Sequence, residues 1–401
     1  WRLPPKDYAL LLDGKGSLSQ VESYWKTLLA PAMQIETPDA LLNDIIRASQ
    51  MHCMLAARNE NGGARISPWA SADRYGPLES ESNSIIRGMD MTGQADFARR
   101  SLDFLLDHCN DEGFITTGYT LVGTGEVLWT LGEHYQRTGD RDWLKKVAPD
   151  VVRACRWIIR QREKTKRLDA QGRKTPEFGL TPPGVTADWD RYAYRLFNDA
   201  QYYAGLEAAG RVLADIADPA APAIQEEARE YREDILRAYR WVQARTPVVR
   251  LADGTWVLGD PALLDCFGRV EDFLPAEDGN RTWCYSIEIG AHHLAATGVL
   301  DPTSKETEEM IDYLEDVQFL RSGMGDYPAE KNREDVFCLG GFAKLQPYYC
   351  RIAEVYATRD DVKPFIRSYF NAIPTLVSRE NLSFWEHYHN IAGWNKTHET
   401  G

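Results

Sequence analysis

The predicted helices of this sequence are joined by links that alternate between short and long. This alternation restricts the fold more than any single motif does. Apolar residues at helical spacing, with capping residues at the segment ends, predict eleven helices. They are expected at about 37–56, 80–92, 94–109, 123–138, 140–163, 197–216, 223–245, 283–297, 303–320, 340–357 and 361–377. The links after odd-numbered helices are long, at 57–79, 110–122, 164–196, 246–282, 321–339 and 378–401.

The links after even-numbered helices are short, as in MTGQ and RTGD. Helical hairpins repeated around a ring with this alternation place every long link on one face, where long ordered loops usually form a binding site. A plain solenoid is the alternative, but the sequence shows no fixed repeat. Residues 247–260 predict a small β-hairpin with its turn at Asp253-Gly254.

The helix count also predicts the domain organisation. Residues 1–36 are expected to be a lead-in from an upstream region, with a short helix around 21–29. Residues 37–401 are expected to form one barrel that lacks its last helix, because an odd number of helices leaves one hairpin incomplete. We therefore expect further domains upstream and downstream.

Composition restricts the partners. The chain has 60 acidic and 46 basic residues, a formal net charge of −14, which argues against nucleic acid and anionic membrane surfaces as partners. No apolar run is long enough to span a bilayer. The 7 Cys are scattered without CxxC spacing, so neither a metal site nor a disulfide framework is expected.

The C-terminal stretch SFWEHYHNIAGWNKTHETG combines aromatic rings with carboxylates and imidazoles. Flat aromatic faces stack on the apolar faces of sugars, and carboxylates can transfer protons. The alternative is an aromatic loop that only covers a helical core. The side chains that favour a sugar site here are Trp385, Glu386, His387, Tyr388, His389, Trp394 and His398.

A ring of six helical hairpins resembles the (α/α)6 barrel of the six-hairpin glycosidase superfamily, an all-α fold. The nearest resemblance is to the catalytic domains of α-L-rhamnosidase-like glycoside hydrolases, over most of 37–401. Trp385, Glu386 and His398 are similar to the family's late segment, in which a Trp-Glu pair carrying the base precedes a His. The segment DRYGPLESESN occupies the place of the general acid, although the family's Arg-Asp-Glu-Arg run is absent. The resemblance implies a glycosidase that is secreted or periplasmic.

Glycoside hydrolysis with inversion needs a protonated carboxyl group and a carboxylate base, about 6.5–9.5 Å apart. Glu79 and Glu81 begin a predicted inner helix, and Glu386 precedes the place of the last one, so ring closure would bring them together. We therefore predict Glu79 or Glu81 as the acid and Glu386 as the base. Acidic residues also favour the first turn of a helix for its dipole, which is the alternative for Glu79 and Glu81.

The long links supply further candidates for binding sugar hydroxyl groups and rings. Asp188, Trp189 and Arg191 lie in TADWDRYAYR, which could equally be a solvated loop. Trp283 and Tyr285 could form a sugar wall, whereas Asp326 and Glu330 are alternatives for either carboxyl role. Other polar residues are expected to be structural or core residues, or are left open: Asp90, Glu126, Trp129, His292 and His293.

Three other functions remain open. A polysaccharide lyase on a similar toroid would use Tyr or His as the base and Arg to neutralise a uronate, and Arg191, Arg195 and Arg281 are available. A sugar epimerase would use paired His residues. A non-catalytic carbohydrate-binding or scaffold protein would use the aromatic loops alone. No phosphate-binding Gly loop precedes a helix, and sugar hydrolysis needs no cofactor, so none is expected.

Overall fold

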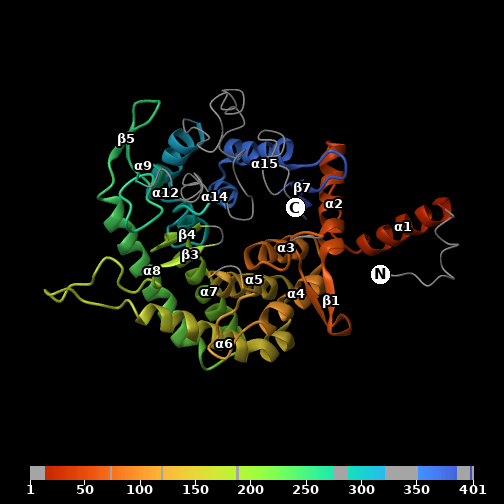
Figure 1. The fold of residues 1–401 in the computed structure, drawn as a ribbon, viewed down its shortest axis with the longest axis horizontal. Coiled ribbons are helices and arrows are strands. Elements are labelled where there is room, and N and C mark those ends of the chain that lie inside the picture. The colour runs from red at the N-terminus through yellow and green to blue at the C-terminus, as the bar shows by residue number, and fades with distance from the viewer. Residues whose placement is uncertain are drawn as a thin grey trace.

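The protein is an all-α toroid in which the helices follow one another around a central axis (Figure 1). The computed structural model describes residues 14–72, 75–118, 121–186, 189–273, 288–320, 351–385 and 398–399. The predicted fold class is therefore confirmed. The division into 1–36 and 37–401 stays a prediction.

Two sets of helices make up the toroid. The inner helices contact one another in succession: α3 (Glu79–Met91), α5 (Gly123–Thr138), α7 (Leu196–Asp215), α11 (His292–Ala296) and α14 (Ile352–Arg359). The outer helices pack between them: α2 (Ala40–Ala56), α4 (Ala95–Asp107), α6 (Arg141–Glu163), α8 (Ala221–Gln243), α12 (Lys305–Tyr313) and α15 (Val362–Leu376). Inner α7 is buried on almost every side, whereas outer α8 buries one stripe, as amphipathic outer helices do.

Local chemistry fixes several helix ends where the sequence predicts them. Asp39 caps α2 by accepting hydrogen bonds from Leu41 N and Leu42 N. Asp140 caps α6 through Trp143 N, and Gly139 closes α5 at a φ of 63°, in the left-handed region that favours glycine.

Glycines allow the inner helices α5 and α7 to touch backbone to backbone. A Cβ atom at Gly125 would lie 2.5 Å from Gln201 O, and one at Gly205 would lie 2.5 Å from Gly125 O. Any larger side chain would push the helices apart and strain the core, at a typical cost of about 1–3 kcal/mol.

The described long links lie side by side at one end of the ring. Thr117 Oγ1 of the second link donates to Pro77 O of the first, at 2.6 Å. The third link meets the fourth where Leu264 N donates to Tyr194 O at 3.1 Å. The fourth link reaches the residues after α12, since Ala252 N donates to Asp316 Oδ2 at 2.7 Å. These contacts support the predicted gathering of long links on one face.

The part of the chain that the structure describes contains four short antiparallel strand pairs. The predicted hairpin is confirmed as β5 (Val248–Arg250) and β6 (Trp256–Leu258). The others were not predicted, and they are β1 (Arg58–Glu60) with β2 (Arg65–Ser67), β3 (Gly184–Thr186) with β4 (Trp189–Ala193), and β7 (Phe384–Trp385) with β8 (His398–Glu399).

Three helix predictions differ from the structure. The helix expected at 340–357 begins only at Ile352 within the described residues, because Arg351 before it has φ −102° and ψ 17°, outside the helical region. Within the described residues, the helix expected at 283–297 begins only at His292, and 288–291 form turns and bends. In a helix the carbonyl oxygen of Glu288 would accept from a backbone amide, but here it lies 2.8 Å from the side-chain atom His293 Nε2. The lead-in helix is longer than predicted and runs from Gly14 to Leu29 as α1. Smaller elements are α9 (Val270–Phe273), the 3-10 turn Asn61–Gly63 and the π-helical segment Leu314–Leu320.

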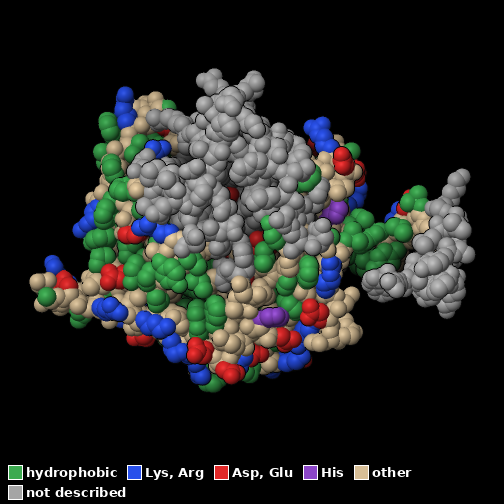
Figure 2. Space-filling model, viewed as in Figure 1, with side chains coloured by type: hydrophobic (Ala, Val, Ile, Leu, Met, Phe, Trp, Pro, Cys, Tyr) green, Lys and Arg blue, Asp and Glu red, His purple; other side chains and the backbone are tan. Residues whose placement is uncertain are grey.

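Helix α1 projects from the body of the molecule, and hydrophobic side chains gather on it (Figure 2). Leu18, Val21 and Tyr24 are exposed there. Around the rim of the viewed face, basic and acidic side chains alternate without a large area of one sign. No described helix is long and apolar enough to cross a membrane.

Candidate active site

Glu79 lies at the start of inner helix α3, as predicted, and its side chain is fully buried. Glu79 Oε1 accepts hydrogen bonds from Thr116 Oγ1, at 2.5 Å, and from Thr117 N, both in the second long link. A Cβ atom at Gly123 would lie 2.7 Å from Glu79 Cγ, so the glycine makes room for this side chain. Glu81 is buried in the same turn, with 6% of its surface exposed.

Glu126 is a third buried carboxyl group at this end of the ring, in the first turn of α5. Burial raises the pKa of Glu126 to about 7, against the opposing effect of the Arg351 charge, and the charge of Glu79 raises it further. Glu126 Oε2 is buried and has no hydrogen-bond partner among the described residues. A carboxyl group in this state can hold a proton near neutral pH.

Arg351 reaches Glu126 from the opposite side of the ring. Arg351 immediately precedes α14, which is separated from α5 by α7 and α11, so contacts between the two helices cross the axis. The Arg351 guanidinium lies 4.1 Å from the ring centre of Trp129 on α5. Glu126 and Trp129 therefore face the axis, which only the folded ring shows.

Further charged side chains from the inner helices lie close to Trp129 and to one another. The Arg87 guanidinium from α3 lies 5.1 Å from the ring centre of Trp129. Arg87 also pairs with Glu133 at 2.6 Å and with Glu354 of α14 at 3.3 Å. We call this set of residues the axis cluster, and it consists of Glu79, Ser80, Arg87, Glu126, Trp129, Glu133, Arg351 and Glu354.

The neighbouring polar residues on the inner helices are structural. His293 Nδ1 lies 3.2 Å from Gln201 Nε2, and burial lowers the pKa of His292. Both histidines are packed, as predicted. Asp90 lies 3.1 Å from His134 Nδ1 and 3.6 Å from Arg137, and its structural role stays a prediction.

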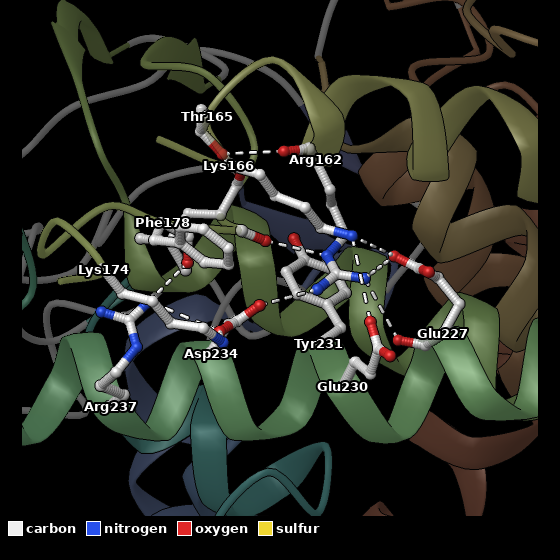
Figure 3. A network of polar contacts seen from close by, with 12 residues as sticks. Arg162, Thr165, Lys166, Lys174, Phe178, Glu227, Glu230, Tyr231, Asp234 and Arg237 are labelled. Atoms are coloured by element: carbon white, nitrogen blue, oxygen red, sulfur yellow. Dashed lines mark hydrogen bonds and ion pairs between the residues drawn. The ribbon is translucent and has the colours of Figure 1, made fainter. Parts of the chain in front are cut away.

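A second buried group of charges fastens the third long link to the outer helices (Figure 3). The fully buried Arg162 side chain donates from Nε to Gly179 O at 2.8 Å and from Nη2 to Asp234 Oδ2 at 3.1 Å. Its Nη1 donates to the Glu227 carboxylate. We call this set the rim network, and it consists of Arg162, Lys166, Lys174, Asp199, Glu227, Tyr231, Asp234 and Arg237.

Asp199, in the first turn of inner helix α7, connects this helix to the rim network. Its Oδ1 accepts from the Tyr231 hydroxyl at 2.5 Å, from Thr181 N at 2.8 Å and from Thr181 Oγ1 at 3.0 Å. Burial raises the pKa of Asp199 to about 6 although these donors lower it. The third link is thereby fixed just before β3 and β4, which carry the predicted residues Trp189 and Arg191.

Some predicted site residues are brought together, and others lie outside the described residues. Trp385 of β7 pairs in register with His398 of β8. Arg191 of β4 lies 3.6 Å from Asp265 in the fourth link. The predicted residues outside the described ranges are Asp188, Trp283, Tyr285, Asp326, Glu330, Glu386, His387 and His389.

The role of Glu126, at the start of a predicted helix, was left open by the sequence, and Arg351 was not among the predicted residues. The signal for Glu126 was its place in the first turn of an inner helix next to a long link. The signal for Arg351 was absent, because more than 200 residues separate it from Glu126 along the chain. Within the described ranges, no group of three or more His, Cys, Asp or Glu residues has the arrangement of a metal site.

Comparison with known proteins supports the fold. No protein-family model matches this sequence, and no curated protein matches it. A solved wild-type glycosidase aligns with a TM-score of 0.51 and 14% identity over 88% of each chain. Two single-residue variants described as the same kind of enzyme align with the same TM-score. A metal-independent alpha mannosidase of Streptococcus pneumoniae aligns at a TM-score of 0.42, with 9% identity over 77% of this chain and 76% of that chain.

Proposed function

We propose that this protein is a glycoside hydrolase. The observation that carries the proposal is the meeting of buried carboxyl groups from two inner helices, Glu79 and Glu126, at the end of a toroid where the long links gather. A site of this kind supplies acid–base chemistry. The likeness of the fold to solved glycosidases supports the proposal.

The reaction would use one carboxylic acid and one carboxylate base. The acid comes from the buried carboxyl groups at the starts of α3 and α5, among which Glu79 and Glu81 are the candidates that the sequence predicts. Glu386 is proposed as the base, since it directly follows Trp385, whose strand pairs with His398. We propose inversion at the anomeric carbon, in which the base activates water on the face opposite the leaving group.

We also propose exo-acting cleavage. Arg87, Trp129 and Arg351 stack across the axis behind Glu126. A ring blocked at this depth offers the substrate a recess with one entrance, which suits the end of a sugar chain. The sequence resemblance makes α-L-rhamnosides the first substrates to test, and a carbohydrate is the expected partner.

A screen of the protein against aryl glycosides tests the proposed function. Release of the aryl group with an intact free sugar supports hydrolysis. A product with a conjugated double bond, detected by its ultraviolet absorbance, would instead identify a lyase. Binding of sugars without any turnover would favour a non-catalytic carbohydrate-binding protein.

Glu386→Ala tests the proposed base. We expect turnover to fall by about 100- to 10,000-fold with substrate binding largely kept, because general catalysis contributes this much to rate. Added azide should restore part of the activity by replacing the activated water. Loss of binding equal to the loss of rate would make Glu386 a ligand of sugar hydroxyl groups.

A further inference from the structure

We infer that Glu126 is the proton donor of the reaction and that Arg351 faces it across the ring. This inference rests on the proposed function and goes beyond it by choosing one carboxyl group, which sequence analysis left open.

The place of Glu126 is the axis of the ring. It stands one turn into α5, and Arg351, which acts on its carboxyl group, comes from the far side of the ring. Gly123 and Gly125, which flank Glu126 on the same turn, are in close contact with Glu79 and with α7. The two sides of this turn are therefore packed, and the carboxyl group between them points towards the axis.

The pairing of Glu126 is incomplete. Among the described residues, neither Glu126 Oε2 nor the nearby Ser80 Oγ has a hydrogen-bond partner, and both atoms are buried. Ser80 lies close enough to lower the pKa of Glu126, although its geometry is not that of a hydrogen bond. A buried polar atom without a partner is unfavourable, and a ligand or water group in the site can supply the missing hydrogen bond.

The charges that face Glu126 have opposing effects on its pKa. On α3, Glu79 raises its pKa and Arg87 lowers it, and Arg351 before α14 lowers it more strongly than either. On α7, the buried Tyr202 is neutral, since burial raises the pKa of its hydroxyl group, which donates to Leu121 O. Burial is the largest effect, and the result is a pKa of about 7. A proton donor is most effective with a pKa near the working pH.

Glu79 is less suited to give a proton. Its Oε1 already accepts from Thr116 Oγ1 and Thr117 N, and both donors belong to the link that closes over α3. These bonds use Oε1 of Glu79 as an acceptor, so this oxygen is engaged with the second link. We assign Glu79 the role of keeping the second link in place and of raising the pKa of Glu126 by its charge.

In the reaction, the proton on the Glu126 carboxyl group moves to the glycosidic oxygen. The bond between that oxygen and the anomeric carbon breaks, and its electron pair stays with the oxygen. Water forms the new bond to the anomeric carbon and loses a proton to the base, for which Glu386 is proposed. Proton exchange with solvent then returns Glu126 to its acid form and the base to its carboxylate form.

The test compares Glu126→Gln with Asp260→Asn on a series of glycosides. Asp260 is a matched control, because burial also raises its pKa to about 7, but its Oδ1 accepts from the Tyr239 hydroxyl at 3.1 Å, away from the axis. We expect Glu126→Gln to lower kcat by about 100- to 10,000-fold on glycosides with poor leaving groups and far less on activated aryl glycosides. Asp260→Asn should change neither rate by more than about threefold.

The pH profile gives a second measurement that does not depend on a single variant. Wild-type activity should fall as the pH rises above about 7, because Glu126 then loses its proton. In Ser80→Ala this limb should move to higher pH, since the hydroxyl group that lowers the pKa of Glu126 is gone.

Three results are decisive. Equal losses of Glu126→Gln on good and poor leaving groups, or an unmoved limb in Ser80→Ala, would overturn the assignment. A loss that depends on the leaving group in Glu79→Gln, with Glu126→Gln active, would give the proton to Glu79 and leave the hydrolase proposal intact. A wild-type protein that hydrolyses no glycoside would remove the proposed function itself.

Discussion

The axis cluster and the rim network are both groups of buried charges, and they differ in how their central side chains, Glu126 and Arg162, are paired. At the edge of the rim network, Arg237 Nε lacks a partner among the described residues. In the rim network, each nitrogen of the Arg162 side chain donates to an oxygen of the third link or of α8 (Figure 3). In the axis cluster, Glu126 Oε2 and Ser80 Oγ are buried without partners among the described residues.

This difference separates structure from function in physical terms. A buried charge that makes all its hydrogen bonds holds chain segments together. Removing one partner leaves a buried charge without compensation, which strongly destabilises the fold. Glu126 Oε2 has no partner among the described residues and faces the axis, so a water or substrate group can supply its missing hydrogen bond. We therefore read the rim network as a scaffold and the axis cluster as the site.

The largest expected effect on stability is at the centre of the rim network. Arg162→Met removes a fully buried partner from both Glu227 and Asp234, so the free energy of unfolding should fall by about 3–5 kcal/mol in a denaturant titration. Arg229→Met is the control, because the exposed Arg229 pairs with the exposed Glu226 on the same helix and should change the value by less than about 1 kcal/mol. Similar losses in both variants would remove the distinction.

Glu126→Gln should have the opposite effect on stability, and only at higher pH. The folded pKa of Glu126 is raised from 4.5 to about 7, so its contribution to stability is full below pH 4.5 and is lost as the pH rises through 7. At a pH of about 8 the free energy of unfolding of the variant should be about 3 kcal/mol higher than that of the wild type. At pH 4 the two free energies of unfolding should be equal. Equal differences at both pH values would show that Glu126 keeps an ordinary pKa.

A smaller effect is expected where the rim network reaches α7. Tyr231→Phe removes one of the three hydrogen bonds to Asp199 Oδ1, which should cost about 1.5–3 kcal/mol because the acceptor is an acidic group. Tyr135→Phe is the control, since the Tyr135 residue is buried but its hydroxyl group makes no hydrogen bond to the described residues. If the two variants unfold alike, Asp199 is not the junction between the third link and α7.

Much of the toroid could be predicted from the sequence because local signals set it. Apolar spacing places most helices within a few residues, and the capping residues Asp39, Gly139 and Asp140 act on their immediate neighbours. The turn at Asp253-Gly254 is equally local, with Gly254 at a φ of 95°. The helix at 292–296 was predicted too long because a side chain, His293, takes the carbonyl of Glu288.

The site could be predicted only in part, for a different reason. Glu79 and Glu81 were found because acidic residues at the start of an inner helix are visible as a pattern. The meeting of Glu126 with Arg351, or of Arg162 with Asp234 72 residues away, depends on how the ring closes. No local pattern carries that information, so unpaired atoms in the folded ring were needed to find Glu126.

The most direct test of the account is an NMR time course of glycoside cleavage by the wild-type protein, beside Glu126→Gln. We predict that the wild type first releases a free sugar of inverted anomeric configuration. From a substrate with a poor leaving group, Glu126→Gln should release the sugar at least about 100-fold more slowly. An unsaturated product, or an unchanged rate in Glu126→Gln, would contradict the account.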